Sequence, residues 1–158
     1  MIEYEYSFIV KDKTPYLEYC IKNKYKKEKE ALQTRELFRN KNKILARITT
    51  DVRDEKEKIV VDFKDDNSSN VILKTSRETK PFSINNNDKE AIYSVLEILN
   101  FKKHKLLKRH RVVYQKDSVT FEIDSYIEPE KMFVVAIEGE KEAVDKVYEK
   151  LKQLIDKE

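Results

Sequence analysis

The chain has 158 residues, enough for one domain with a substantial core, and 40% of them are charged. Its 33 lysines and arginines nearly cancel its 30 aspartates and glutamates, and the net charge of +3 argues against a nucleic-acid-binding protein, which needs a strongly one-signed surface. The single cysteine, Cys20, excludes a disulfide framework, and the single glycine excludes the glycine-rich phosphate loops of Walker and Rossmann sites.

The sequence also lacks an apolar run long enough to span a bilayer, and its first residues do not resemble a signal peptide. We therefore expect a soluble protein of the cytoplasm with no membrane partner. Nine tyrosines and seven phenylalanines favour an ordered, strand-rich fold.

Alternating apolar and polar residues predict eight strands. The fifth contains Pro81, which cannot donate a hydrogen bond to a strand ladder. In chain order the predicted strands are Ile2–Val10, Ala31–Phe38, Ile44–Thr50, Lys58–Lys64, Val71–Ile84, Lys105–Gln115, Ser118–Ile127 and Met132–Glu138.

Three helices are predicted between and after these strands. Thr14 and Pro15 begin the first, as N-cap and first helical residue, and the lysine-rich run Lys22–Lys29 forms its solvated end or a loop. Asn85–Asp88 caps the second, and the third begins near Lys141. Their buried stripes are predicted as Ala91, Ile92, Val95, Leu96 and Leu99, and as Ala143, Val144, Val147, Tyr148, Leu151, Leu154 and Ile155.

Short connections between the strands favour antiparallel neighbours. Eight antiparallel strands suit a barrel with helices packed outside it. We therefore predict an α+β fold, an eight-stranded antiparallel β-barrel with flanking helices, as a single domain over residues 1–158.

Nearly every predicted strand has one apolar face and one face that carries charge. On the first strand, Glu3 and Glu5 share a face, and on the sixth Arg109 and Arg111 do. Two geometries fit this alternation. Either the charged faces of an open sheet point to water, which is the commoner arrangement and would suit an interaction domain, or the sheet closes and the charges point into a polar interior.

The closed geometry predicts a specific chemistry. Buried charges must be paired or coordinated. Arginine and lysine clamp phosphate oxygens, and carboxylates hold Mg²⁺ or Mn²⁺, which usually bridges phosphates. An interior with both signs of charge therefore suits a polyphosphate together with a divalent cation.

Several strand motifs, taken in order, resemble those of the CYTH family, the triphosphate tunnel metalloenzymes. Glu3-Tyr4-Glu5-Tyr6-Ser7 occupies the place of the family's ExExK motif, and Leu99–Lys102 that of its segment after the middle helix. Arg109–Tyr114 is similar to its basic strand, and Val119–Asp124 and Val135–Glu140 to its acidic strands. This family includes class IV adenylyl cyclases, thiamine triphosphatases and inorganic triphosphatases, and its fold is an eight-stranded tunnel.

The resemblance implies two sets of site residues. The metal ligands would be Glu3, Glu5, Asp124 and Glu138, and the triphosphate ligands would be Arg47, Lys64, Arg77, Arg109 and Arg111, with Arg35 and Glu122 as additional site residues. No nucleophile is assigned, because Ser7 has no visible base beside it.

The sequence also departs from the family pattern. Ser7 replaces the motif's lysine, Thr49 an arginine and Ala136 an acidic residue, while Thr79 and Pro81 stand where a glutamate is common and Arg35 where an acidic residue is frequent. The expected function is hydrolysis of an inorganic, thiamine or nucleoside triphosphate with Mg²⁺ or Mn²⁺, rather than cyclase activity, by a monomer or homodimer. The alternative is a polyphosphate- or nucleotide-binding module with little or no catalysis.

Overall fold

The structure is a computed structural model that describes residues 2–66 and 73–157, and the side chains of residues 4–66 and 75–157. In these ranges it contains three α-helices, one short 3₁₀ helix and nine strands that form one antiparallel sheet. The helices are α1 (Thr14–Lys22), η1 (Asn86–Asp88), α2 (Lys89–Ile98) and α3 (Lys141–Ile155). The strands are β1 (Ile2–Val10), β2 (Lys26–Arg39), β3 (Ile44–Arg53), β4 (Lys56–Asp65), β5 (Leu73–Arg77), β6 (Phe82–Ile84), β7 (Lys102–Lys116), β8 (Val119–Glu128) and β9 (Met132–Gly139).

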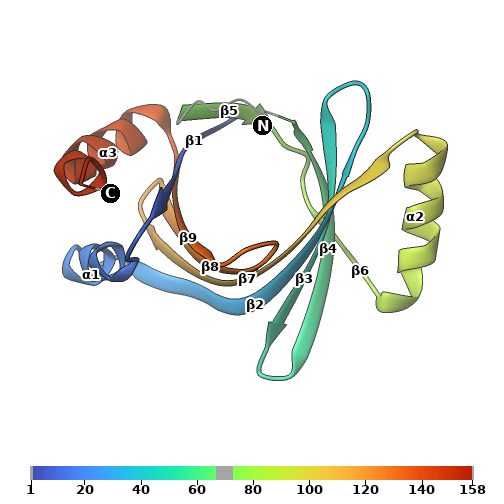
Figure 1. The fold of residues 1–158 in the computed structure, drawn as a ribbon, viewed down its shortest axis with the longest axis horizontal. Helices are drawn as coiled ribbons and strands as arrows, with labels where there is room; N and C mark the ends of the chain where they lie inside the picture. The colour runs from blue at the N-terminus through green and yellow to red at the C-terminus, as the bar shows by residue number, and fades with distance from the viewer. Residues whose placement is uncertain (1, 67–72, 158) are drawn as a thin grey trace.

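The sheet curls around a central opening, which lies near the middle of Figure 1. Its strand order is β5-β1-β9-β8-β7-β2-β3-β4-β6, so β5 and β4 meet across the remaining side of the ring. Among the described residues they are joined by an isolated bridge between Lys64 and Glu78, not by a continuous ladder. The predicted α+β tunnel with flanking helices is confirmed, with β6 as a ninth strand beside the eight that surround the opening.

The predicted fifth strand is wrong in its extent. Residues 71 and 72 lie outside the described residues, and the remainder is divided into β5 and β6 by a break that contains Pro81. Proline has no N–H to give to a ladder, so the chain leaves β1, which pairs with β5, and joins β4 through β6.

The lysine-rich segment was also predicted wrongly. Helix α1 ends at Lys22, and β2 already begins at Lys26, within the predicted solvated run. The register of β2 with β7 extends from Lys26, opposite Gln115, to Arg39, opposite Lys102, so the long partner strand continues the ladder through charged residues. At the other end of α1, Lys13 is the N-cap and Thr14 is already helical.

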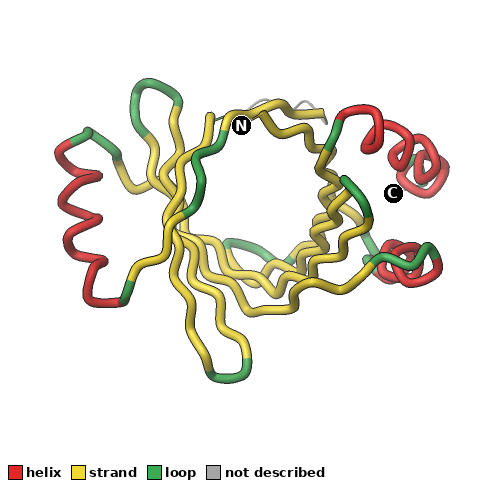
Figure 2. Tube along the Cα trace, turned by 180° about the vertical axis from the view of Figure 1, so that it is seen from behind, coloured by secondary structure: helices red, strands yellow, loops and turns green. Residues whose placement is uncertain are grey.

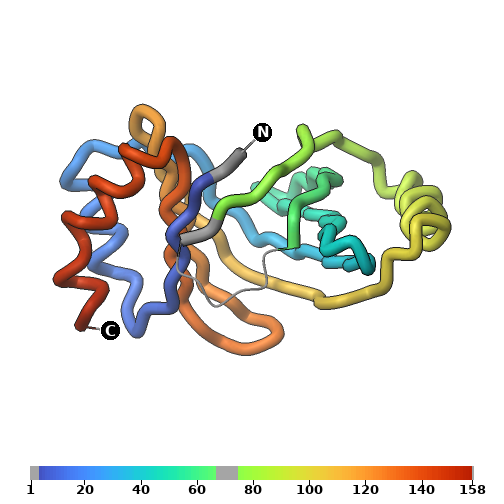
Figure 3. Tube along the Cα trace, turned by 90° about the horizontal axis from the view of Figure 1, so that it is seen from above, coloured from blue at the N-terminus to red at the C-terminus, as the bar shows by residue number. Residues whose placement is uncertain are grey.

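Two hydrophobic cores lie outside the ring, beneath the helices. Figures 2 and 3 show α1 and α3 on one side of the ring and α2 on the opposite side. The larger core packs α1 and α3 against strands that include β8 and β9, with Phe121, Ile137 and Val144 fully buried. The smaller core packs α2 against β3 and β4, around Ile48 and Leu96. The apolar strand faces therefore point outward, which leaves the polar faces for the interior.

The predicted buried stripe is confirmed in α3 and only partly in α2. In α3, Val144, Val147 and Leu151 are buried and the other predicted positions are half-buried. In α2, Leu96 is buried, but Val95 and Leu99 are 49% and 53% exposed. The contact face of α2 instead includes Tyr93, which packs on Phe38 and whose hydroxyl donates to Glu36 Oε1 at 2.6 Å. Tyr93 therefore joins Ile92 and Leu96 of the predicted stripe in the contact with the core.

No helix in residues 2–66 and 73–157 is both long enough and apolar enough to cross a membrane.

Candidate functional site

A cavity of about 330 Å³ lies inside the ring of strands. The charged residues that line it share the inward strand faces. The basic ones are Arg35, Arg47, Lys64, Arg109 and Arg111, and the acidic ones are Glu5, Glu78, Glu122, Asp124 and Glu138. Of the two geometries that alternation allowed, the closed one is confirmed.

One side of the cavity is a tight group of ion pairs between β7 and β8. Arg111 lies opposite Asp124 in the strand register and donates to both of its carboxylate oxygens, at 2.8 Å each. It also donates to Glu122 Oε2 at 2.6 Å. Burial alone would raise the pKa of the Asp124 carboxyl, but the hydrogen bonds and charge of Arg111 outweigh it, so the pKa lies below its usual value. Arg111 is therefore neutralised by the protein itself.

A second network holds Arg109 in place, and sequence patterns did not reveal most of it. Arg109 is 3% exposed and donates to Gln33 Oε1 at 2.8 Å and to the Tyr126 hydroxyl at 2.5 Å. The amide of Gln33 donates in turn to Asp51 Oδ1 at 2.9 Å, and Asp51 is ion-paired to Lys29. The alternation of β2 places Gln33 inward beside Arg35, which is the only signal that could have predicted it.

Arg47 and Lys64 lie on the opposite side, on β3 and β4. Arg47 binds Asp62 with two donors and Glu78 Oε1 with one at 2.7 Å. Burial would lower the pKa of its guanidinium, but these two carboxylates raise it above the ordinary value. Lys64 Nζ lies 3.6 Å from Glu5 Oε2 and 3.5 Å from Glu78 Oε1.

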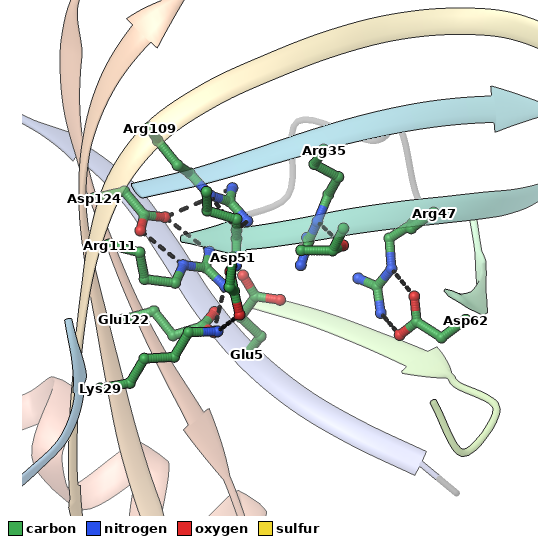
Figure 4. Close-up of polar contacts among 12 residues, drawn as sticks. Glu5, Lys29, Arg35, Arg47, Asp51, Asp62, Arg109, Arg111, Glu122 and Asp124 are labelled. Atoms are coloured by element: carbon green, nitrogen blue, oxygen red, sulfur yellow. Dashed lines mark hydrogen bonds and ion pairs between the residues drawn. The ribbon is translucent and has the colours of Figure 1, made fainter. Parts of the chain in front are cut away.

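Arg35 differs from every other arginine in the cavity. It projects from β2 between the two paired groups, as Figure 4 shows, and its Nε donates to Thr49 Oγ1 at 3.0 Å. Across the described residues it makes no ion pair with a carboxylate. Burial, followed by the charges of Arg109 and Arg47, lowers its pKa well below the ordinary value. Arg35 is thus a cation inside the tunnel that the surrounding carboxylates do not neutralise.

The predicted metal ligands are only partly gathered. Glu5 and Glu138 are register partners on β1 and β9 and both line the cavity, so two carboxylates fit the oxygen ligation that Mg²⁺ and Mn²⁺ prefer. The side chain of Glu3 lies outside the described residues, and Asp124 is held by Arg111. Over the described ranges, no group of three histidine, cysteine or acidic side chains is placed to hold a metal ion.

The predicted inward orientation of Arg77 is wrong. Its side chain is 79% exposed and binds Asp65, with 3.0 Å between Nε and Oδ2. The register of β5 with β1 places Ser76 opposite Glu3, so residues 76 and 78 face inward and Arg77 outward. Glu78 consequently places a glutamate on the inward face, where the sequence predicted Thr79 and Pro81. Only the register with β1, not the strand alone, could have shown that residue 78 faces inward.

The other departures from the family pattern also gather in the cavity. Ser7 and Ala136 are register partners on β1 and β9, so two small side chains lie side by side on one wall. Thr49 is the register partner of Arg35 and accepts its hydrogen bond. The arginine that the third strand lacks is therefore replaced, across the ladder, by an arginine on β2.

No protein-family model matches the chain, and no curated protein matches it by sequence. Solved structures do match in fold. A conserved hypothetical protein from Pyrococcus furiosus is 26% identical, with 96% of this chain and 90% of that one covered at a TM-score of 0.73. A Hippeastrum protein described as having a dominant triphosphatase activity is 16% identical, with 96% and 87% covered at 0.67.

A third structural match has a different description. A chain of the Schizosaccharomyces pombe Mediator head module is 8% identical, with 98% of this chain and 96% of that one covered at a TM-score of 0.69. At such identities the likeness concerns the fold. The chain has the tunnel fold of the CYTH, or triphosphate tunnel, proteins in a diverged form, as its strand motifs predicted.

Proposed function

We propose that this protein binds a triphosphate-containing small molecule in its tunnel and hydrolyses it with the aid of a divalent cation. The observation that carries the proposal is Arg35, a guanidinium inside the tunnel without a carboxylate partner among the described residues. Arg35 is half-buried, and a cation in such a site is unfavourable unless an anion joins it. A phosphate group supplies that anion, and arginine binds phosphate with paired hydrogen bonds.

The neighbouring cations suit a chain of phosphates rather than a single one. Arg47 and Lys64 on one side and Arg109 and Arg111 on the other lie around the same cavity as Arg35. Their own carboxylates hold them in position before any ligand arrives, so little ordering is needed on binding. Each hydrogen bond between a phosphate oxygen and such a cation contributes about 1.5–3 kcal/mol.

Hydrolysis would use water as the nucleophile. Water adds to the terminal phosphorus while the bond to the bridging oxygen breaks, which yields orthophosphate and the shortened phosphate chain. Arg35, Arg47 and Lys64 would bind the phosphate oxygens on which negative charge increases, and the fixed geometry would keep the chain aligned for attack. Glu5 and Glu138 would hold a divalent cation, which supplies further charge stabilisation at the phosphate oxygens when bound.

The Hippeastrum neighbour supports the hydrolytic reading, since it has the same fold and a described triphosphatase activity. A second candidate, a polyphosphate-binding module without catalysis, is favoured by Ser7 and Ala136. On the β1–β9 wall of the cavity, these small residues stand where the family pattern has a lysine and an acidic residue. Fold likeness does not decide between the two, because one fold hosts many functions.

A direct assay separates these two functions. Pure protein is incubated with tripolyphosphate, ATP or thiamine triphosphate and Mg²⁺ or Mn²⁺, and phosphate release is measured. We expect release by the wild type, a loss of at least about 100-fold in Glu5→Gln/Glu138→Gln because metal binding is impaired, and no change in Glu142→Gln, an exposed control on α3. Binding without any release would favour the module instead.

A further inference from the structure

A second pocket, of about 860 Å³, lies between the turn that joins β2 to β3 and the segment that joins α2 to β7. Both segments lie in the upper right of Figure 1. Among the described residues that line this pocket, none is acidic. Its basic side chains, which define what we term the basic pocket, are Arg39, Lys41, Lys102, Lys103 and His104.

An irregularity in the sheet gathers three of these side chains. The register of β2 with β7 shifts by one residue, at a bulge where His104 has no partner on β2. A bulge changes the direction in which the side chains around it point. Lys102, Lys103 and His104 therefore all line the pocket, whereas a regular strand would alternate them between its two faces.

Both walls of the pocket are held by their own hydrogen bonds. In the β2–β3 turn, Asn40 Oδ1 accepts from the backbone N–H groups of Asn42 and Ile44, at 3.0 and 3.2 Å. After α2, the N–H of Phe101 donates to the carbonyl of Leu96 at 2.9 Å. The pocket is therefore formed before a ligand arrives, so little ordering is needed on binding.

Three lysines of the basic pocket carry charge that the protein does not neutralise. Lys41, Lys102 and Lys103 are exposed, and within residues 4–66 and 75–157 none of them forms an ion pair. Arg39, by contrast, is ion-paired to Asp66, with 2.6 Å between Nε and Oδ2. The net charge of the whole chain is only +3, so this group of lysines is a local concentration of charge that attracts carboxylates.

Beside the basic pocket, α2 exposes an apolar face. Val95, Ile98 and Leu99, which we term the α2 stripe, are 49%, 80% and 53% exposed, and Leu99 also lines the pocket. Their spacing of three and four residues places them on one side of the helix, next to the face of Ile92 and Leu96 that packs on the core. Exposed apolar side chains that cluster in this way indicate an interaction surface.

From this juxtaposition we infer that the surface binds an acidic amphipathic helix of a partner protein. The partner's apolar side chains cover the α2 stripe, and its carboxylates pair with the lysines of the basic pocket. An amphipathic helix presents both kinds of side chain at the required spacing, and two helices pack by interlocking such rows. The basic pocket shares no described lining residue with the tunnel cavity, so this binding is independent of the proposed function.

Two other anionic partners fit these residues less well. Single-stranded nucleic acid is usually bound by aromatic side chains that stack on its bases, and the described lining of the basic pocket contains no phenylalanine or tyrosine. An anionic membrane presents a wide charged plane, which the exposed carboxylates of Glu90 and Glu97 on α2 would repel. A single helix can instead lie over the lysines alone.

Fluorescence anisotropy with a labelled synthetic peptide tests this binding. The peptide contains glutamate and leucine over about 14 residues, roughly four helical turns, with leucine repeated every three or four positions so that one face is apolar. A second peptide has the same composition, but its leucines are distributed around the helix. Both are titrated with the wild type, with Lys102→Glu/Lys103→Glu and with Ile98→Gln.

Matched control variants lie on the other side of the ring, as Figure 2 shows for α1 and α3. Lys146→Glu/Lys150→Glu on α3 makes the same change of charge, and Ile21→Gln on α1, at a residue that is 65% exposed, makes the same apolar loss. Every substituted residue is exposed, so the variants keep the packing of the two cores.

We expect the wild type to bind the amphipathic peptide, more weakly as salt is added, and to bind the second peptide less tightly. Lys102→Glu/Lys103→Glu should weaken binding at least about tenfold, because two attractive contacts become repulsive. Ile98→Gln should weaken it about three- to tenfold. Both control variants should bind as the wild type does.

Absence of binding by the wild type, or equal affinities of the wild type and Lys102→Glu/Lys103→Glu, would overturn the inference. Equal affinities of the wild type for the two peptides would overturn it as well. Phosphatidylserine vesicles and single-stranded oligouridylate are measured in parallel. Binding of either that is tighter than that of the amphipathic peptide, and is lost in Lys102→Glu/Lys103→Glu, would assign the surface to a membrane or to RNA instead.

Discussion

Arg111 and Arg35 lie on adjacent strands, face the same cavity and have opposite electrostatic situations. Arg111 is held by Asp124 and Glu122, which outweigh burial and raise its pKa. Among the described residues, Arg35 hydrogen-bonds the Thr49 hydroxyl and no carboxylate, and burial followed by the charges of Arg109 and Arg47 lowers its pKa. The strand pattern places both side chains inside, but only the partners decide whether a charge is structural. A paired arginine stabilises the tunnel, and under the proposed function an arginine without a carboxylate partner is the one that binds an anionic ligand.

The largest expected effect comes from removing Asp124, the carboxylate that pairs with Arg111. Asp124→Ala removes the carboxylate that both Arg109 and Arg111 contact and leaves Glu122 as the partner of Arg111. Removing one partner of a buried ion pair costs about 3–5 kcal/mol. Denaturant unfolding should show this loss in the free energy of unfolding. A loss of less than about 1 kcal/mol would mean that Arg111 does not depend on this pair.

Substitution of Arg35 should change the free energy of unfolding in the opposite direction. Arg35→Gln removes an uncompensated cation and keeps a donor for Thr49, so the ligand-free protein should become more stable by about 1–2 kcal/mol. Arg77→Gln, at an exposed arginine outside the tunnel, is the control. A destabilisation of Arg35→Gln as large as that of Asp124→Ala would show that Arg35 is structural.

Acid should gradually remove the stability that the paired carboxylates Asp51 and Asp124 contribute. The pKa of Asp51 lies below its usual value, because the hydrogen bonds from Lys29 and Gln33 outweigh burial, and the pKa of Asp124 is lowered likewise. A carboxylate with a depressed folded-state pKa contributes stability above its unfolded pKa of about 3.9 and loses it as the pH falls through the folded value. The free energy of unfolding should therefore decrease below about pH 4, and less steeply in Asp51→Asn.

The smallest effect concerns a residue distant from the tunnel. Burial raises the pKa of the Cys20 thiol to about 12, and its side chain is fully enclosed in the core beneath α1. Native protein should not react with a thiol reagent at pH 8, whereas denatured protein should react with one equivalent. Rapid labelling of the native protein would show that α1 opens readily.

Much of the fold could be predicted because it depends on local alternation. The bounds of β1 and the start of α3 follow from patterns in their own sequence, and so does the inward face of Arg109 and Arg111. The prediction was wrong where a residue distant in sequence determines which way a side chain points. The register with β1 turns Arg77 outward, and the contact of Tyr93 with Phe38 adds Tyr93 to the buried face of α2.

In the site, too, local alternation could be predicted and cross-strand partners could not. Sequence parity identified the charged residues that point inward on β1, β3, β7 and β8, but it could not assign their partners. The network through Gln33 and Asp51, and the replacement of an arginine at position 49 by Arg35 across the ladder, depend on cross-strand register. A strand read alone carries no information on which residue lies opposite.

The central claim, that Arg35 is the tunnel cation available to a polyanion, is tested most directly by calorimetric titration with ATP in the presence of Mg²⁺. Wild type, Arg35→Gln and the exposed control Arg77→Gln are compared. We predict unchanged affinity for Arg77→Gln and a loss of about 10- to 100-fold for Arg35→Gln. Equal affinities of the wild type and Arg35→Gln would contradict it.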